Sequence, residues 1–313
     1  MNRRILVTGA SGFVGAALIR RLKETPGNMV ITIRRDYIPS EPILEDVCLR
    51  GDITDYDLVR RAVADFEVDT IFHLASQSIV RICAADPVTA YNVNVMGTVN
   101  ILEAVRSVGG GRVKSVVVST SDKAFGHAPA PYTEETPLMP KYTYEATKAC
   151  QDIVCQNYFH NYEVPVKIAR FSNIYGPGDP NWSRLIPNTI RKIISGERPQ
   201  LYTDVADYIR EFVYIDDAVD GILLLDEKAP PGEIYCVGGT SVCKIDNLVK
   251  MILDICKSSL SIELIQKQAV FKEIETQYID ATKVKALGWN AKFSLEEGLK
   301  RTIEHYRKSV VSQ

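Results

Sequence analysis

Short runs of β-branched residues alternate with longer stretches of helical periodicity through the first 170 residues of this 313-residue chain. The pattern predicts strands in RRILVTG, MVITIR, TIFHLAS, VKSVVVST and VPVKIAR, with an amphipathic helix after each of the earlier ones. Successive parallel strands need a crossover connection, which a helix supplies. The alternation therefore predicts a parallel sheet covered by helices on both faces, with ligands beyond the carboxyl ends of the strands.

The character of the sequence changes near residue 172. The stretch NIYGPGDPNWS is rich in turn formers, and the helical stretches after it are shorter and more separate. We expect an α/β fold in which residues 1–172 form a Rossmann-type, doubly wound parallel sheet. Residues 173–313 are expected to form mainly a smaller C-terminal α/β lobe that binds substrate, with some segments returning to the first domain.

A glycine-rich turn, GASGFVG at residues 9–15, joins the first predicted strand to the helical pattern AALIRRLKE. Glycines at this place let the backbone approach a pyrophosphate and let the first amides of the helix receive the anion. A tight structural turn is the alternative, but the position at the start of a βαβ series favours a dinucleotide. The predicted contacts are Gly9, Ser11, Gly12, Phe13, Val14 and Gly15.

The second predicted strand ends at Arg34 and Arg35, where an NAD site commonly carries an acid for the ribose hydroxyls. Because arginine pairs well with phosphate, these two residues favour NADP. Asp36 follows directly and is able to reach the ribose, which keeps NAD open. Asp52 and Ile53, in the GDI turn, are expected beside the adenine, although the same turn would also serve to cap a helix.

Tyr144 and Lys148 are four residues apart in YEATKACQDIVCQNY, which reads as a helix, so both side chains project from one face. A tyrosine titrates near pH 10, so a phenol that removes a proton at neutral pH needs a neighbouring cation. Lys148 and an oxidised nicotinamide ring supply that charge. The strand VKSVVVST leads into Ser119, Thr120 and Ser121 at its carboxyl end, where Ser121 is placed to orient a substrate hydroxyl.

Together, GASGFVG, GDITD, FHLASQSIV, NVNVMGTVNILEAV, STSDKAFG, ARFSNIYGPGD and REFVYIDDAVDGI resemble the extended short-chain dehydrogenase/reductase family of nucleotide-sugar epimerases and dehydratases. The resemblance spans nearly the whole chain. It implies that Ser121, Tyr144 and Lys148 form the catalytic triad and that Asn173 and Arg210 face the diphosphate of the substrate. Further contacts are expected at Leu74, Ala75 and Ser119 for the cofactor and at Gln77, Ser78, Arg184 and Leu185 for the substrate.

The residues after Ser121 bear on the reaction. Dehydratases of this family typically have an Asp-Glu pair there, whereas this chain has Asp122 and Lys123, which resembles the branch acting on CDP-glucose. We therefore expect a 4,6-dehydratase of CDP-glucose or of a GDP-, dTDP- or UDP-hexose, with Asp122 and Lys123 among the catalytic residues. The alternatives are a nucleotide-sugar 4-epimerase, an NADPH-dependent reductase of a keto sugar, and a dinucleotide-binding module without turnover.

The charge and the cysteine content of the chain indicate which partners, metal sites and cellular compartment to expect. The formal net charge is -2 and no basic run occurs, so neither nucleic acid nor a membrane surface is expected as a partner. The seven cysteines show no metal-ligand spacing, so we expect no metal site and a reduced, cytoplasmic protein. His73 is expected in the core. Apolar stripes in 88–106 and 143–160 are able to form a homodimer through a helix bundle, or to pack on the sheet alone.

Overall fold

The computed structural model describes residues 3–35, 44–109, 111–238, 241–266 and 273–311. At its centre lies a seven-stranded sheet in the order β10-β6-β5-β4-β1-β2-β3, with every neighbouring pair parallel. The strands are β1 (Arg4–Thr8), β2 (Met29–Arg34), β3 (Val47–Arg50), β4 (Thr70–His73), β5 (Ser115–Ser121), β6 (Val166–Phe171) and β10 (Ile234–Val237). The order reverses between β1 and β4, so the predicted doubly wound sheet is confirmed, and its crevice opens at that point.

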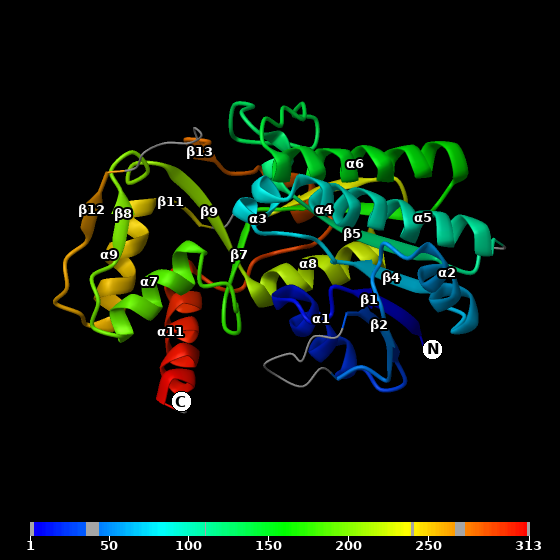
Figure 1. The fold of residues 1–313 in the computed structure, drawn as a ribbon, viewed down its shortest axis with the longest axis horizontal. Helices are drawn as coiled ribbons and strands as arrows, with labels where there is room; N and C mark the ends of the chain where they lie inside the picture. The colour runs from blue at the N-terminus through cyan, green and yellow to red at the C-terminus, as the bar shows by residue number, and fades with distance from the viewer. Residues whose placement is uncertain (1–2, 36–43, 110, 239–240, 267–272, 312–313) are drawn as a thin grey trace.

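Helices cover both faces of this sheet, as Figure 1 shows. One layer contains α2 (Tyr56–Asp65), α5 (Gly97–Val108) and α6 (Thr143–Tyr162), and the other contains α1 (Phe13–Lys23) and α8 (Ile215–Lys228). Because both faces are covered, the inner strands are nearly continuous apolar runs, such as Ile5, Leu6 and Val7 in β1. Shorter helical segments connect the layers: α3 (Val80–Ala85), α4 (Pro87–Tyr91), a π-helical turn (Asn92–Met96), a 3₁₀ turn (Asp122–Phe125) and α10 (Thr282–Ala286).

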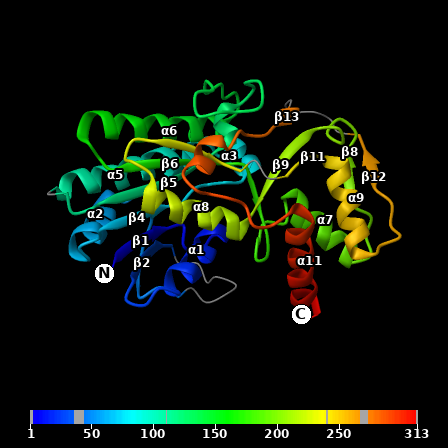
Figure 2. The same ribbon diagram turned by 180° about the vertical axis from the view of Figure 1, so that it is seen from behind.

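A smaller lobe lies beyond the carboxyl edge of the sheet, on the right of Figure 2. Its four-stranded sheet consists of β7 (Asn173–Tyr175), β9 (Ile209–Tyr214), β11 (Val242–Lys244) and β13 (Thr276–Gln277), and β8 (Gln200–Tyr202) pairs with β12 (Glu263–Ile265). Three helices pack against one another in this lobe, namely α7 (Leu185–Ile194), α9 (Ile245–Cys256) and α11 (Leu295–Val311).

Two segments from the second half of the sequence belong to the large sheet. Strand β10 pairs in parallel with β6, and α8 packs on β5, β6 and α1. The chain therefore crosses between the two lobes several times, and the cleft between them is bounded by residues from both halves of the sequence. Within the described ranges, no helix combines the length and the apolar character needed to cross a membrane.

Candidate active site

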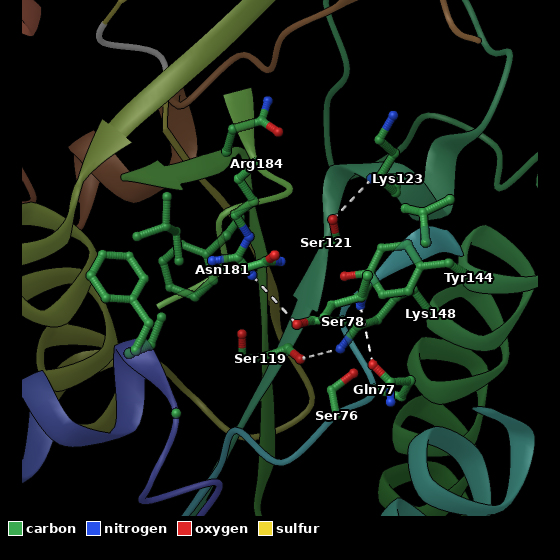
Figure 3. Close-up of a pocket in the computed structure, with 18 of the residues that line it drawn as sticks. Ser76, Gln77, Ser78, Ser119, Ser121, Lys123, Tyr144, Lys148, Asn181 and Arg184 are labelled. Atoms are coloured by element: carbon green, nitrogen blue, oxygen red, sulfur yellow. Dashed lines mark hydrogen bonds between the residues drawn. The ribbon is translucent and has the colours of Figure 1, made fainter. Parts of the chain in front are cut away.

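A cleft of about 1130 Å³ runs along the carboxyl edge of the large sheet and under the small lobe. This volume exceeds that of a pocket for one drug-sized ligand, so a dinucleotide and a second ligand have room in it. Every site residue predicted from the sequence and present in the described ranges lines this one cleft. Figure 3 shows the part that contains Ser121, Tyr144 and Lys148.

The glycine turn forms one end of the cleft. Gly9 has a φ of +72°, and a Cβ there would lie 2.7 Å from the backbone nitrogen of Ala75. A Cβ on Gly15 would lie 2.2 Å from the carbonyl oxygen of Gly9. Helix α1 begins after Gly12 with no side-chain cap and no acidic residue in its first turn. Its first amides are therefore available to a phosphate, and the turn fits the pyrophosphate of a dinucleotide.

The end of β2 differs from the sequence-based expectation. Arg34 Nη2 lies 2.9 Å from Glu45 Oε1 and Arg34 Nε lies 3.1 Å from Cys48 Sγ. These contacts hold the Arg34 side chain along β3. Of the two arginines on which the predicted NADP preference depends, Arg34 is therefore not directed to a 2′-phosphate. Arg35 is exposed and lies 3.6 Å from Asp52, whose other oxygen accepts from the amide and hydroxyl of Thr54. Asp36 lies outside the described residues.

Tyr144 stands in the first turn of α6, with its ring packed against Cys83, Ala90 and Val80. Burial raises the pKa of its phenol to about 12, while a hydrogen bond with the Ser121 hydroxyl acts in the opposite direction. Figure 3 shows the Tyr144 phenol beside the Ser121 side chain, whose hydroxyl also accepts from the backbone amide of Lys123. At neutral pH the phenol of the unliganded chain is therefore protonated, and a neighbouring cation is needed to ionise it.

Lys148 lies one helical turn further along the same face of α6. Its ammonium donates to the carbonyl oxygen of Ser119 at 3.1 Å and to Oε1 of Gln151 at 2.9 Å. Burial lowers the pKa of Lys148 to about 8. At neutral pH the amine is mostly protonated, so it is a cation one helical turn from Tyr144. The charge of Arg184 also lowers the pKa of the Tyr144 phenol.

Asp122 and Lys123 follow Ser121 in a 3₁₀ turn. The Ser121 hydroxyl donates to Asp122 Oδ1 at 3.1 Å, and burial raises the pKa of Asp122. Burial, and then the charge of Arg210, lower the pKa of Lys123, whose ammonium lies on the far side of Ser121 from Tyr144 in Figure 3. Burial thus shifts the Asp122 carboxyl group toward its acid form and the Lys123 amine toward its neutral form.

The opposite wall of the cleft comes from the small lobe. Arg184 lies 2.9 Å from Asp179 and donates to the Ser78 hydroxyl at 3.4 Å, which connects the two lobes (Figure 3). Asn173 donates to the carbonyl oxygen of Glu211 at 2.9 Å. The Arg210 guanidinium donates to the carbonyl oxygen of Ile274 at 2.6 Å. These donors line the cleft beside the triad.

Several residues at the site are absent from the sequence-based prediction. Glu145 caps α6 by accepting from the amides of Lys141 and Tyr142. The sequence does not signal this cap, because the N-cap position is Tyr142 and not the serine or threonine of the usual capping box. Gln151, the partner of Lys148, gives no signal either, because a glutamine in a helix is usually a surface residue.

His73 is a core residue, as predicted. Its Nδ1 lies 2.7 Å from the Thr8 hydroxyl and its Nε2 lies 2.9 Å from the Thr98 hydroxyl. Burial lowers the pKa of the imidazole to about 3, so the ring is neutral at physiological pH. It has no access to the cleft and takes no direct part in the chemistry there.

Comparison with known proteins places this geometry in a family. Residues 6–302 match the family described as GDP-mannose 4,6 dehydratase. The low-salt glycan biosynthesis protein Agl12 of Haloferax volcanii is 30% identical over 96% of this chain and 98% of its own length. The dTDP-glucose 4,6-dehydratase DesIV of Streptomyces venezuelae, solved with NAD bound, is 29% identical and has a TM-score of 0.87 over 99% of this chain and 98% of its own.

An epimerase has an equally similar fold. The UDP-glucose 4-epimerase of Thermotoga maritima is 27% identical and has a TM-score of 0.89 over 98% of this chain and 99% of its own. The predicted likeness to the branch acting on CDP-glucose remains a prediction, because these relatives do not test it. The match over residues 6–302, on a fold with the glycine turn and the Ser/Tyr/Lys set in one cleft, shows that this chain belongs to the GDP-mannose 4,6-dehydratase family of extended short-chain dehydrogenases/reductases.

Proposed function

We propose that this enzyme is a 4,6-dehydratase that converts a nucleoside-diphosphate hexose to its 4-keto-6-deoxy form. The observation that supports this most strongly is Asp122, a buried carboxyl group beside the Ser121 hydroxyl whose pKa is raised by burial. Oxidation at C4 requires only Ser121, Tyr144 and Lys148. Loss of the 6-hydroxyl also requires an acid, and Asp122 is placed to supply it.

Each residue then has a defined task. Ser121 orients the 4-hydroxyl, and Tyr144 removes its proton while the charge of Lys148 stabilises the phenolate. The glycine turn at Gly9, Gly12 and Gly15 would hold a dinucleotide, which would supply the hydride acceptor for C4 and the hydride donor for C6. The resulting ketone acidifies the C5 hydrogen, Lys123 in its neutral form takes that proton, and Asp122 protonates the departing 6-hydroxyl. Lys123 then returns the proton to C5 as C6 receives hydride. We assign Asn173, Arg184 and Arg210 to the diphosphate, because all three line the cleft from the small lobe and carry N–H donors.

A 4-epimerase is the second candidate, supported by the Thermotoga maritima enzyme of similar fold. Such an enzyme needs no acid beside the triad. Incubation with CDP-, GDP-, UDP- and dTDP-hexoses, followed by mass spectrometry, distinguishes the two. A dehydratase gives a product lighter by one water molecule, and an epimerase gives a product of unchanged mass. Net consumption of NADPH would instead indicate a reductase.

We propose NAD as the cofactor, and we expect NAD to bind more tightly than NADP. Arg34 is held by Glu45 and is therefore not available to pair with a 2′-phosphate. The relative DesIV was solved with NAD. Calorimetric titration with each dinucleotide measures the difference. The substitution Glu45→Ala removes this acceptor from Arg34 and should reduce the difference between the two affinities. Tighter binding of NADP to the unaltered chain would refute the assignment.

We also propose a cytoplasmic homodimer formed through α5 and α6, which lie side by side along one edge of the molecule in Figure 1. Ile153, in α6, is 56% exposed, and Val88, Met96 and Tyr162 also expose apolar side chains on this layer. Ile153→Asp should convert a dimer to a monomer in light scattering. Leu264→Asp, at a leucine that is 60% exposed in the small lobe, is the control that should leave the mass unchanged.

A further inference from the structure

The buried ammonium of Lys148 is held by neutral groups. Among the described residues no carboxylate forms an ion pair with it, and its two acceptors are the Ser119 carbonyl and the side-chain oxygen of Gln151. Gln151 is itself completely buried. A buried cation without a counter-ion depends on its hydrogen-bond acceptors, so the Gln151 amide has a direct effect on whether the amine keeps its proton.

The orientation of the Gln151 amide follows from its partners. An ammonium only donates, so the oxygen of Gln151 faces Lys148 and its nitrogen faces the Thr98 hydroxyl, 2.9 Å away. The Thr98 hydroxyl uses its one hydrogen on the carbonyl oxygen of Asn94, at 2.7 Å. Thr98 must therefore accept from Gln151, and the amide cannot rotate without losing both of its bonds.

The same counting fixes the tautomer of His73. Because the only hydrogen of the Thr98 hydroxyl is already used, His73 Nε2 carries the proton and donates to Thr98, at 2.9 Å. The neutral ring then accepts at Nδ1 from the Thr8 hydroxyl, at 2.7 Å, and that hydroxyl accepts from the amide of Ala75, at 3.2 Å. Ala75 is the residue against which Gly9 packs. A continuous chain of hydrogen bonds thus connects Lys148 with the wall of the glycine turn.

No other neighbour of Lys148 supplies a negative charge at neutral pH. Cys155 faces it from α6, Cys83 from α3 and His73 from β4, and Tyr144 lies one turn away on α6. Burial raises the pKa of Tyr144 and of both thiols, and the ring of His73 is neutral. Gln151 is accordingly the one side chain in the described structure that accepts a hydrogen bond from Lys148.

We infer that Gln151 is a positioning residue that holds the Lys148 ammonium on the Ser119 carbonyl and sets the pH at which Lys148 loses its proton. It touches neither substrate nor cofactor and acts through Lys148. The inference rests on the proposed function, because Lys148 must be cationic to support the Tyr144 phenolate. The neutral Gln151 amide keeps the Lys148 amine charged at neutral pH. A carboxylate at the same place would also keep it charged, but its negative charge would cancel the effect of the ammonium on the Tyr144 phenol.

The test compares two substitutions of similar size, Gln151→Met and Gln151→Glu. The methionine removes the acceptor, so the pKa of Lys148 falls and the alkaline limb of the kcat/KM profile moves to lower pH. The glutamate supplies a negative charge, so the pKa rises and the limb moves to higher pH. We expect about one pH unit in each direction, because a hydrogen bond to a charged group contributes about one pKa unit or more. Should one variant fail to fold, the other still gives a signed result.

Gln156 provides the matched control on the same helix. Its amide donates to Asp152 at 2.7 Å and does not contact Lys148, so Gln156→Met and Gln156→Glu should leave the limb in place. The inference would be overturned if the alkaline limb of the kcat/KM profile stayed at the same pH in both Gln151 variants, or moved in the same direction in both. If no hexose is turned over, the proposed function fails, and an NMR titration of labelled lysines, assigned with Lys148→Met, still reads the pKa and decides the role of Gln151.

Discussion

Tyr144→Phe should lower turnover by about a thousandfold, within the range that a general base contributes. The substitution removes only the phenol oxygen, so the 4-hydroxyl of the hexose loses the group that takes its proton. The ring keeps its contacts with Cys83, Ala90 and Val80, so we expect unchanged thermal stability and unchanged dinucleotide affinity. Product formation measured by mass spectrometry, with calorimetric titration of the dinucleotide, separates lost chemistry from lost binding.

Tyr158→Phe is the control for that experiment. Tyr158 lies on the same helix, and its hydroxyl donates to Glu103, at 3.3 Å, away from the cleft. This variant should keep the turnover of the unaltered enzyme. Near-normal turnover in Tyr144→Phe would remove Tyr144 from its assigned role. Equal losses in both variants would point instead to a general effect of removing a phenol from α6.

Asp152→Ala should lower the free energy of unfolding by about 3–5 kcal/mol, because it leaves a buried guanidinium without its counter-ion. The carboxylate of Asp152, in α6, accepts from Arg170 in β6 through two bonds, at 2.7 and 2.9 Å. Both side chains are at most 3% exposed. Arg170 also donates to the carbonyl oxygen of Glu134, at 2.9 Å, so the pair connects α6, β6 and the segment after the 3₁₀ turn. Denaturant unfolding measures the loss.

Two further variants make that result specific. Replacing both partners, with Asp152→Leu and Arg170→Met together, removes the pair without leaving a charge, and should recover most of the loss. Glu296→Ala breaks an exposed ion pair with Lys300 in α11 and should change stability by less than about 1 kcal/mol. A similarly small effect of Asp152→Ala would show that the guanidinium finds other partners or solvent.

Local patterns in the sequence were sufficient to predict five of the seven strands of the large sheet and the position of the cleft. The glycines at 9 and 15, the hydroxyls that end β5, and the four-residue spacing of Tyr144 and Lys148 all depend on chain neighbours, and the structure brings them into one cleft. Such features can be predicted from sequence because the periodicities of strands and helices, and the residues that form turns, involve only neighbouring positions in the chain.

The remaining features depend on contacts between distant segments. Glu45 and Cys48 hold Arg34 from the neighbouring strand β3 and its approach, which no pattern around residue 34 reveals. Gln151 reaches Thr98 from a different helix, and the partner of Arg170 lies in α6. Pairing across elements is decided by packing, so a single sequence does not give it.

The position of β10 at the edge of the large sheet has a consequence for any shortened form of this protein. An amino-terminal fragment ending near residue 172 would lack both β10 and α8, so the backbone of β6 would have no neighbour on its outer side and part of one face would be bare. Unpaired strand edges of this kind recruit other chains. During synthesis the nascent sheet is therefore incomplete until Val237 has left the ribosome, and half-length products are expected to aggregate.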